Sequence, residues 1–362
     1  MLKKNIFILT LLSLTLFPFT VESKGDGPPI FYESIRYRGM GGPFIAVSDD
    51  QSGIWTNAAG LHQIEEHKRW ALLDAHIAWD ATIVDMAQDF DDLDDTPIQT
   101  ARKYVGQRGE IEITNHGYVV TPNNFGIGAL WKGTATASVN NYAAPSVDLD
   151  ARNDFGLVGA FSRPFLGPII VGNHKAVGNW GAALKFFYRE GTIGNFDFAD
   201  ANELDIIKNP RDRANTSHAV SLDLSTIFHL DDSNETKFAI GLYDVFRVDF
   251  GDNLEDIDRN LRFGFSFKPL IDNETFKDTT FAMDYDDALT TGDIFNHIRL
   301  GAETKFHNWD FRAGLYQGYL SVGVGVHVGF FNLDYANYSH ELGPRTGVKD
   351  DRMNAFRVGF VF

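Results

Sequence analysis

Apolar residues alternate with polar residues or glycine at a period of two over most of this chain. The clearest case is the last ten residues, where one face carries Phe356, Val358, Phe360 and Phe362. The other face of the same stretch carries Ala355, Arg357 and Gly359. Successive side chains of a strand point to opposite faces, so this pattern predicts strands with one apolar face and one polar or glycine-rich face.

Fourteen stretches of this kind can be counted. They lie near 67–79, 112–121, 125–139, 153–163, 178–191, 216–230, 236–249, 259–269, 277–287, 296–306, 309–317, 319–328, 330–341 and 353–362. A soluble β-sandwich also alternates. Two features favour a barrel over a sandwich: the apolar face is rich in Phe, Trp and Tyr, and the chain ends on Phe362. We therefore predict an all-β fold, a transmembrane outer-membrane barrel of about fourteen antiparallel strands.

The lengths of the connections mostly follow the rule for such barrels, which have short periplasmic turns and longer outer loops. With the N-terminus in the periplasm, the turns at 122–124 and 307–308 fall on the short side, and 80–111 falls on the long side. Two connections break the rule. The one at 164–177 is long for a periplasmic turn, and the one at 317–318 is tight for an outer loop.

The residues before the first strand do not alternate. Residues 24–64 are rich in glycine and small side chains, and we predict that they form a hatch in or beneath the barrel lumen, with 65–362 as the barrel itself. Glycines on the inward faces of the strands, such as Gly323 and Gly325, would leave room for it.

The N-terminus predicts export. Lys3 and Lys4 precede an almost wholly apolar run at 6–19, and small residues before position 24 favour cleavage near Ser23, so that 1–23 is a signal peptide. The alternative is a membrane anchor, but the run is short for a spanning helix.

Composition excludes several classes of protein. A net charge of −17 argues against a nucleic-acid partner. The chain has no Cys, which removes thiol nucleophiles and Cys-ligated metal sites. Ser217-His218 and Ser339-His340 are adjacent pairs, but neighbouring strand residues point to opposite faces. We therefore expect neither an enzyme, nor a cofactor, nor a bound metal.

The sharpest motif lies in the predicted hatch. It reads RGMGGPFIAVSDD at 38–50, followed by WTNAAGL at 55–61. Its characteristic positions are Gly39, Gly41, Gly42, Asp49, Asp50, Asn57 and Gly60. The motif resembles the N-terminal signature of outer-membrane proteins related to FadL and PorV, with Pro43, Thr56 and Ala58 as departures from it.

The resemblance implies a fourteen-stranded outer-membrane barrel with an N-terminal hatch. FadL-like members pass long-chain fatty acids or other hydrophobic small molecules, and PorV-like members bind exported proteins in type IX secretion. The alternating Phe356, Val358, Phe360 and Phe362 also resemble the signal that the barrel assembly machinery reads.

Basic residues on the polar faces of the strands are the candidate substrate contacts. They are Arg262, Arg299, Arg312, Arg357 and Lys185. A cationic wall could hold a carboxylate head group. Alternatively, Glu303, Asp334 and Asp223, which fall on the same faces, could pair with these cations and only balance the charge of the interior.

These observations predict an outer-membrane channel, in contact with outer-membrane lipids, for passive uptake of hydrophobic or amphipathic molecules such as long-chain fatty acids past the hatch. The alternative is a PorV-like barrel that binds secreted or other partner proteins. A continuous apolar pocket between hatch and wall would favour the channel, and a plugged lumen with ordered, protruding loops would favour the alternative.

Overall fold

The computed structural model describes residues 31–64, 69–90, 97–167, 169–171, 174–231, 235–251, 254–269, 278–290, 292–343 and 345–362. The predicted signal peptide, 1–23, and the first residues of the predicted hatch, 24–30, lie outside the described residues. In the described part of the chain, no helix is long and apolar enough to cross a membrane.

Fourteen antiparallel strands close into a barrel, as the sequence predicted. They are β1 (Trp70–Trp79), β2 (Arg108–Val120), β3 (Phe125–Asn140), β4 (Ser146–Pro164), β6 (His174–Asp197), β7 (Asn215–His229), β8 (Thr236–Tyr243), β9 (Asn260–Phe267), β10 (Thr279–Tyr285), β11 (Ile298–Phe306), β12 (Trp309–Tyr316), β13 (Tyr319–Val328), β14 (Phe331–Glu341) and β15 (Asp350–Val361). Each pairs with the next, and β1 pairs with β15 to close the ring. The short β5 (Ile169–Val171) forms a hairpin with the start of β6, so β4 pairs directly with β6.

The outward faces of the strands are apolar and exposed. Trp70 stacks on Phe362 at the rim where the chain ends, with ring centroids 4.3 Å apart, and Phe330 stacks on Phe362 at 5.1 Å. Towards the opposite rim, Trp79 stacks on Phe356 at 5.9 Å. Aromatic residues near both rims and aliphatic residues between them match the lipid-facing band of a membrane barrel.

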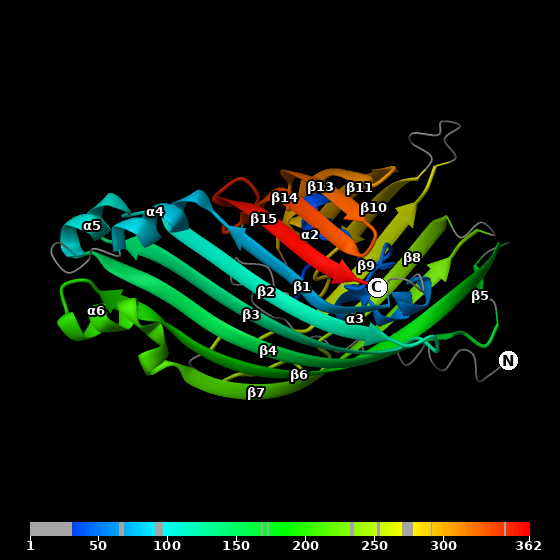
Figure 1. Cartoon of the computed structure of the whole chain (residues 1–362), viewed down its shortest axis with the longest axis horizontal. Coiled ribbons are helices and arrows are strands. Elements are labelled where there is room, and N and C mark those ends of the chain that lie inside the picture. The colour runs from blue at the N-terminus through cyan, green and yellow to red at the C-terminus, as the bar shows by residue number, and fades with distance from the viewer. Residues whose placement is uncertain are drawn as a thin grey trace.

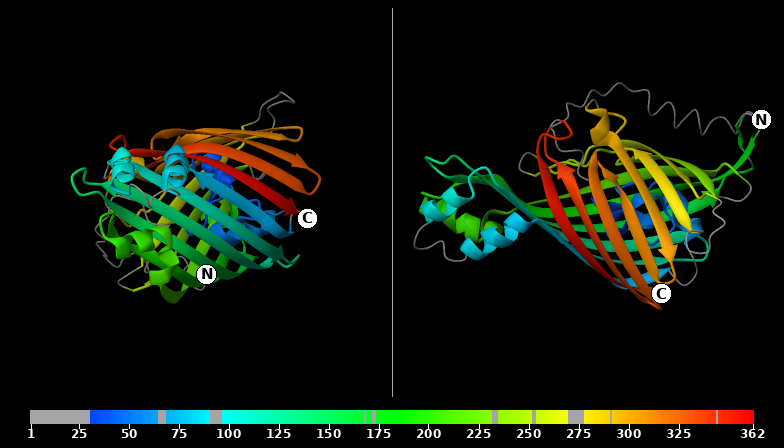
Figure 2. Two further views of the ribbon diagram at one scale, coloured as in Figure 1. Left: turned by 60° about the vertical axis from the view of Figure 1, so that its left-hand side comes forward. Right: turned by 90° about the horizontal axis from the view of Figure 1, so that it is seen from above.

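Helices lie inside the barrel and beyond one of its rims. Helices α2 (Ile35–Gly39), α3 (Gly53–Thr56) and η1 (Ala58–Gln63) form the hatch, drawn in blue among the strands in Figures 1 and 2. Helices α4 (Ala81–Phe90), α5 (Pro97–Lys103), α6 (Ala201–Lys208) and η3 (Pro210–Arg213) cluster where β2, β3, β4 and β6 extend past the rest of the barrel (Figure 1). The short α7 (Ile294–His297) precedes β11.

The helices beyond the rim have a hydrophobic core of their own. Met86, Ala101 and Ile206 from these helices pack with Val147 and Phe196 from the extended strands. These strand positions belong to the outward faces, so the helices take the place of lipid above the membrane. We call this unit the helical cap.

Three strands differ most in length from the sequence prediction. Strand β4 begins before the predicted 153–163, and strand β6 ends after the predicted 178–191. The extra length lies beyond the membrane, where the outward residues of both strands pack in the core of the helical cap. Strand β8 is shorter than the predicted 236–249. It stops at Tyr243 because Asp244 has a φ of 48°, outside the extended region, and its N–H bonds the Asp223 side chain at 2.9 Å.

Candidate functional site: a hatch-filled lumen

The hatch turns sharply at its glycine motif. Ser34 caps α2 by accepting from the N–H of Arg36 at 3.3 Å, and the helix ends where Gly41 and Gly42 have φ values of 87° and 90°. Glycine adopts this left-handed region at little cost, whereas other residues are strained there. The N–H of Gly42 then donates to the carbonyl of Tyr37 at 2.7 Å, which closes the turn.

The hatch backbone lies directly against the barrel wall. A Cβ on Gly301 of β11 would come within 1.8 Å of the Met40 carbonyl oxygen, and a Cβ on Gly323 of β13 within 2.9 Å of the Gly39 Cα. Gly323 thus leaves room for the hatch, as its position on the inward face suggested. Gly325 has another role, because a Cβ there would meet the Asp334 carboxylate at 2.5 Å.

Ion pairs fix one side of the hatch to the wall. The Arg36 guanidinium donates to Glu303 of β11 at 2.9 and 2.7 Å, and to Asp49 and Asp50 of the hatch at 2.6 and 2.8 Å. Burial alone would raise the pKa of Asp49, but Arg36 beside it lowers that pKa to about 2. The two motif aspartates therefore hold the arginine that attaches the hatch to β11.

Two further contacts extend this attachment. Arg38 donates to Tyr338 at 2.7 Å and to Glu112 of β2 at 3.2 Å. The buried carboxylate of Asp284, on β10, accepts from the backbone N–H groups of Phe44 and Ile45 at 2.8 and 3.1 Å. We call the part of the lumen formed by β10 to β15 the ionic side; the bond from Arg38 to Glu112 reaches beyond it to β2.

The other motif residues stabilise turns within the hatch. Asp50 accepts from the N–H of Ser52 at 2.9 Å. Asn57 accepts from the N–H of Ala59 at 3.0 Å, and its amide donates to the Ile45 carbonyl at 2.6 Å. Gly60 packs so closely that a Cβ would come within 2.2 Å of the Ser48 carbonyl oxygen.

Two of the three predicted substrate cations on the ionic side lie within its network of carboxylates. Arg312 donates to Glu303 at 2.7 Å, to Asp310 at 2.8 Å and to Asp334 at 2.6 Å. Arg357 donates to Asp334 at 2.7 Å and also pairs with Asp74. Each guanidinium therefore has at least two carboxylate partners, and Gly325 provides the space in which Arg312 reaches Asp334.

The other three cations also pair with carboxylates. Arg262 pairs with Asp286, and Arg299 approaches the same carboxylate at 3.6 Å. Lys185 lies 2.9 Å from both Asp223 and Asp244. All five predicted residues thus face the lumen next to acidic partners, and their contact with a substrate stays a prediction.

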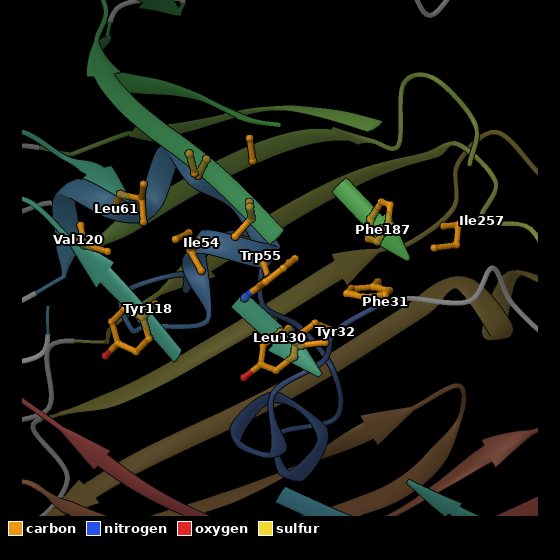
Figure 3. Packing of buried hydrophobic residues seen from close by; sticks show 14 of the residues in the cluster. Phe31, Tyr32, Ile54, Trp55, Leu61, Tyr118, Val120, Leu130, Phe187 and Ile257 are labelled. Atoms are coloured by element: carbon orange, nitrogen blue, oxygen red, sulfur yellow. The ribbon is translucent and has the colours of Figure 1, made fainter. Parts of the chain in front are cut away.

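The opposite side of the lumen is apolar. Hatch residues Phe31, Tyr32, Ile54 and Trp55 pack there against wall residues Tyr118, Leu130 and Phe187 and against Ile257 from the loop after β8 (Figure 3). We call this part of the lumen, formed by β2, β3, β4, β6 and that loop, the apolar side. The sequence did not identify its hatch residues, because the hatch has no strand period to separate inward from outward positions.

A small cavity lies between the hatch and the wall at the edge of the apolar side. Its volume is about 40 Å³. Its apolar lining consists of Phe31, Tyr32, Phe44, Trp55, Tyr243 and Ile257. Lys185 and Arg262, two of the predicted cations, also line it. We call this cavity the aromatic pocket.

A larger polar cavity of about 620 Å³ opens on the other side of the hatch, between it and the extended strands. Glu33 and Arg38 of the hatch line it, and Lys132, Arg299 and Glu341 contribute from the wall. It faces the end of the barrel that carries the helical cap. The lumen therefore consists of a polar vestibule, a tightly packed hatch and an aromatic pocket between hatch and wall.

Comparisons with known proteins identify the fold. No family model matches the chain, and no curated protein matches it. Among solved structures, the CymD monoaromatic hydrocarbon channel is 13% identical, with a TM-score of 0.53 over 94% of this chain and 99% of that one. The Ralstonia pickettii toluene transporter TbuX is 12% identical, with a TM-score of 0.51 over 94% and 99%.

A third similar structure is the deltaS2S3 mutant of the TodX monoaromatic hydrocarbon channel. It is 9% identical, with a TM-score of 0.52 over 93% of this chain and 99% of that one. At such identities the likeness shows the fold alone, a closed antiparallel barrel like that of these outer-membrane channels. These matches give no support to the PorV-like part of the sequence resemblance.

Proposed function

We propose that this chain is an outer-membrane channel through which hydrophobic or amphipathic small molecules diffuse passively past the hatch. The observation that carries the proposal is the aromatic pocket, because it lies between the hatch and the wall and is lined by four rings of the hatch and by Tyr243 of the wall. Similarity of fold to hydrocarbon channels supports the same class of cargo.

The two sides of the lumen suggest how a path could open. On the ionic side, Arg36 and Asp284 hold the hatch by directed bonds to buried partners. On the apolar side, ring contacts between hatch and wall are weakly directional and can re-form after a shift. The directed bonds to β4 and β6 join neutral groups: Ser162 donates to the Ala59 carbonyl at 3.0 Å, and Asn179 bonds His62 at 3.0 Å. A hatch that remains attached through its ionic side could therefore separate from the apolar side.

The orientation follows from the connections. The helical cap and the polar vestibule lie on the outer side, and the turns at 121–124 and 307–308 lie on the periplasmic side with the chain end. Cargo would enter through the vestibule and reach the aromatic pocket, where Lys185 and Arg262 are the predicted cations placed to contact it. Outer-membrane lipids would contact the exposed apolar band.

Export and assembly complete the proposal. The signal peptide would be cleaved near Ser23, and the barrel assembly machinery would recognise the C-terminal strand. Phe356 and Phe362 lie on the outward face of β15, where each stacks on a Trp of β1.

One observation favours a second candidate function, a barrel that binds partner proteins. The helical cap protrudes beyond the barrel (Figures 1 and 2) and has its own buried core. The lumen is also closely packed by the hatch. A protein partner would bind the cap, whereas small-molecule cargo requires the hatch to separate from the wall.

A reversible crosslink tests the channel. The chain has no Cys, so a pair introduced at Ile54 and Gly126 would be unambiguous. A Cβ on Gly126 would lie 3.5 Å from the Ile54 Cγ1, the position that the sulfur of Ile54→Cys can take, so modest adjustment permits a disulfide between hatch and β3. Uptake of radiolabelled toluene and of oleate is measured in cells that express the oxidised or the reduced variant.

We expect uptake of one or both compounds to exceed that of cells without the barrel, to fall on oxidation and to return on reduction. Equal uptake with and without the barrel would refute the channel. An unchanged rate after oxidation would show that cargo does not pass between the hatch and β3. The single variant Ile54→Cys, treated with the same oxidant, is the control.

A further inference from the structure

The ring of Phe31 fills a slot on the apolar side of the lumen. It lies edge-on to Phe187, with ring centroids 4.5 Å apart, and 5.8 Å from the ring of Trp55 (Figure 3). Gly156 of β4 forms the floor of the slot, because a Cβ there would come within 2.6 Å of the Phe31 ring. The slot therefore fits one six-membered aromatic ring that belongs to the protein itself.

The aromatic pocket next to this ring is too small for a second one. A volume of about 40 Å³ accommodates water, whereas an engineered cavity that binds benzene measures about 150 Å³. A ligand ring can thus enter only if a protein group leaves. Phe31 is the group best placed to do so, because its ring both lines the pocket and occupies the slot over Gly156.

Two of the aromatic side chains that line the pocket each carry a buried polar atom without a hydrogen-bond partner among the described residues. These atoms are the indole Nε1 of Trp55 and the hydroxyl of Tyr243, in side chains that are 5% and 7% exposed. Buried donors are almost always bonded, so these two call for an explanation. A hydroxyl group on a ligand could supply it, because a hydroxyl both accepts and donates.

The charge of the pocket disfavours an acid. Its cations, Lys185 and Arg262, are balanced by Asp244 and Asp258 in the same lining, and both cations already have carboxylate partners. A ligand carboxylate would add a buried charge without a free counter-ion, which is unfavourable. An uncharged polar group adds none.

We propose that the aromatic pocket binds a small, uncharged aromatic molecule that carries a hydroxyl group, as phenols do. Its ring replaces that of Phe31 against Phe187 and Trp55. Its hydroxyl bonds the Trp55 Nε1 and the Tyr243 hydroxyl. This inference rests on the proposed function and specifies the class of cargo within it.

Three ligands of one shape provide the test. Toluene, p-cresol and 4-methylbenzoate differ only in the group opposite the methyl, which is a hydrogen, a hydroxyl or a carboxylate. Their binding to the folded full chain in detergent is titrated by saturation-transfer NMR. We expect p-cresol to bind about five- to a hundredfold more tightly than toluene, the effect of two neutral hydrogen bonds, and 4-methylbenzoate to bind most weakly.

Variants assign the effect to the pocket. The double variant Trp55→Phe/Tyr243→Phe keeps both rings and removes both polar atoms, so the preference for p-cresol should disappear. Trp131→Phe/Tyr335→Phe removes the same groups from outward-facing positions and should preserve it. Phe31→Ala should bind both toluene and p-cresol more tightly, because the competing ring is gone.

Each result decides a separate claim. Saturable toluene binding equal to that of p-cresol refutes the phenol class and leaves the channel intact, whereas no saturable binding of any ligand counts against the proposed function itself. A preference that survives in Trp55→Phe/Tyr243→Phe refutes the assigned bonds. Unchanged binding in Phe31→Ala refutes ring exchange. If the double variant does not fold, the single variant Tyr243→Phe still tests the assigned bonds. The ratio of p-cresol to toluene affinity in the wild type still tests the phenol class.

Discussion

Arg36 is the residue on which attachment of the hatch most depends. Its guanidinium, in a residue 9% exposed, donates to Glu303 of the wall and to Asp49 and Asp50 of the hatch. Replacing it by Met keeps a long side chain but leaves these carboxylates without that partner. Removing one member of a buried ion pair costs about 3–5 kcal/mol.

The lower end of that range applies here, because Glu303 keeps its bond to Arg312 at 2.7 Å. A loss of about 3 kcal/mol corresponds to a roughly hundredfold increase in the population of the detached hatch. Hydrogen exchange of backbone amides measures the population of the detached hatch when detachment and reattachment are faster than exchange itself. The reporters are the N–H groups of Phe44 and Ile45, which are protected only while the hatch contacts Asp284.

Arg247→Met is the matched control. Arg247 lies 2.9 Å from Asp258 and 3.2 Å from Asp256, but its side chain is 61% exposed, so its pairs are worth at most about 1 kcal/mol. We expect exchange in the hatch to stay within about fivefold of the wild type. If Arg36→Met changes exchange at Phe44 and Ile45 by less than tenfold, the ionic side does not hold the hatch and the reasoning above fails.

Three further predictions concern the hatch and the rim. Gly301→Val should displace the hatch at Met40 and raise single-channel conductance in planar bilayers while the barrel still forms; Gly159→Ala, with open space at its Cβ, should not. Burial lowers the pKa of His62 to about 4, below its usual 6.5, so as the pH falls the unfolded chain binds a proton before the folded chain does. The thermal stability should therefore fall between pH 6.5 and 4, and His62→Gln should flatten this decline in thermal melts. Phe362→Ala should reduce the yield of folded barrel in outer-membrane fractions, whereas an unchanged yield would contradict its role in assembly.

The period of two made the barrel predictable. Alternation such as that from Phe356 to Phe362 depends only on neighbours in the chain, and it fixes which face of a strand meets lipid. The same rule placed Arg312 and Arg357 in the lumen. It could not show where a strand ends above the membrane, because Val147 in β4 keeps its outward side buried in the helical cap instead of in lipid.

The partners of the predicted cations could not be read from the sequence. Arg312 bonds carboxylates at positions 303, 310 and 334, which come together only through the registers of β11 to β14. The hatch was harder still. Its motif glycines were visible, but Phe31 and Trp55 carry no local signal that they would face β4 and β6, since their direction is set by how the whole hatch packs against the wall.

The division of the lumen into two sides explains why the cations cannot simply be counted as head-group sites. Arg312 contacts three carboxylates, so a fatty-acid head group would have to displace a carboxylate already held at 2.6–2.8 Å. Arg299 differs, because it faces the vestibule and lies 3.6 Å from its only acidic partner recorded in the described chain. Loss of acid binding in an Arg312 variant would therefore report a rearranged ionic side. Loss in Arg299→Ala, with hatch exchange unchanged, would report a direct contact in the vestibule. The residue that tests head-group binding is Arg299, whose carboxylate partner is the most distant of the five, and Arg312, with three carboxylate partners, tests the integrity of the ionic side.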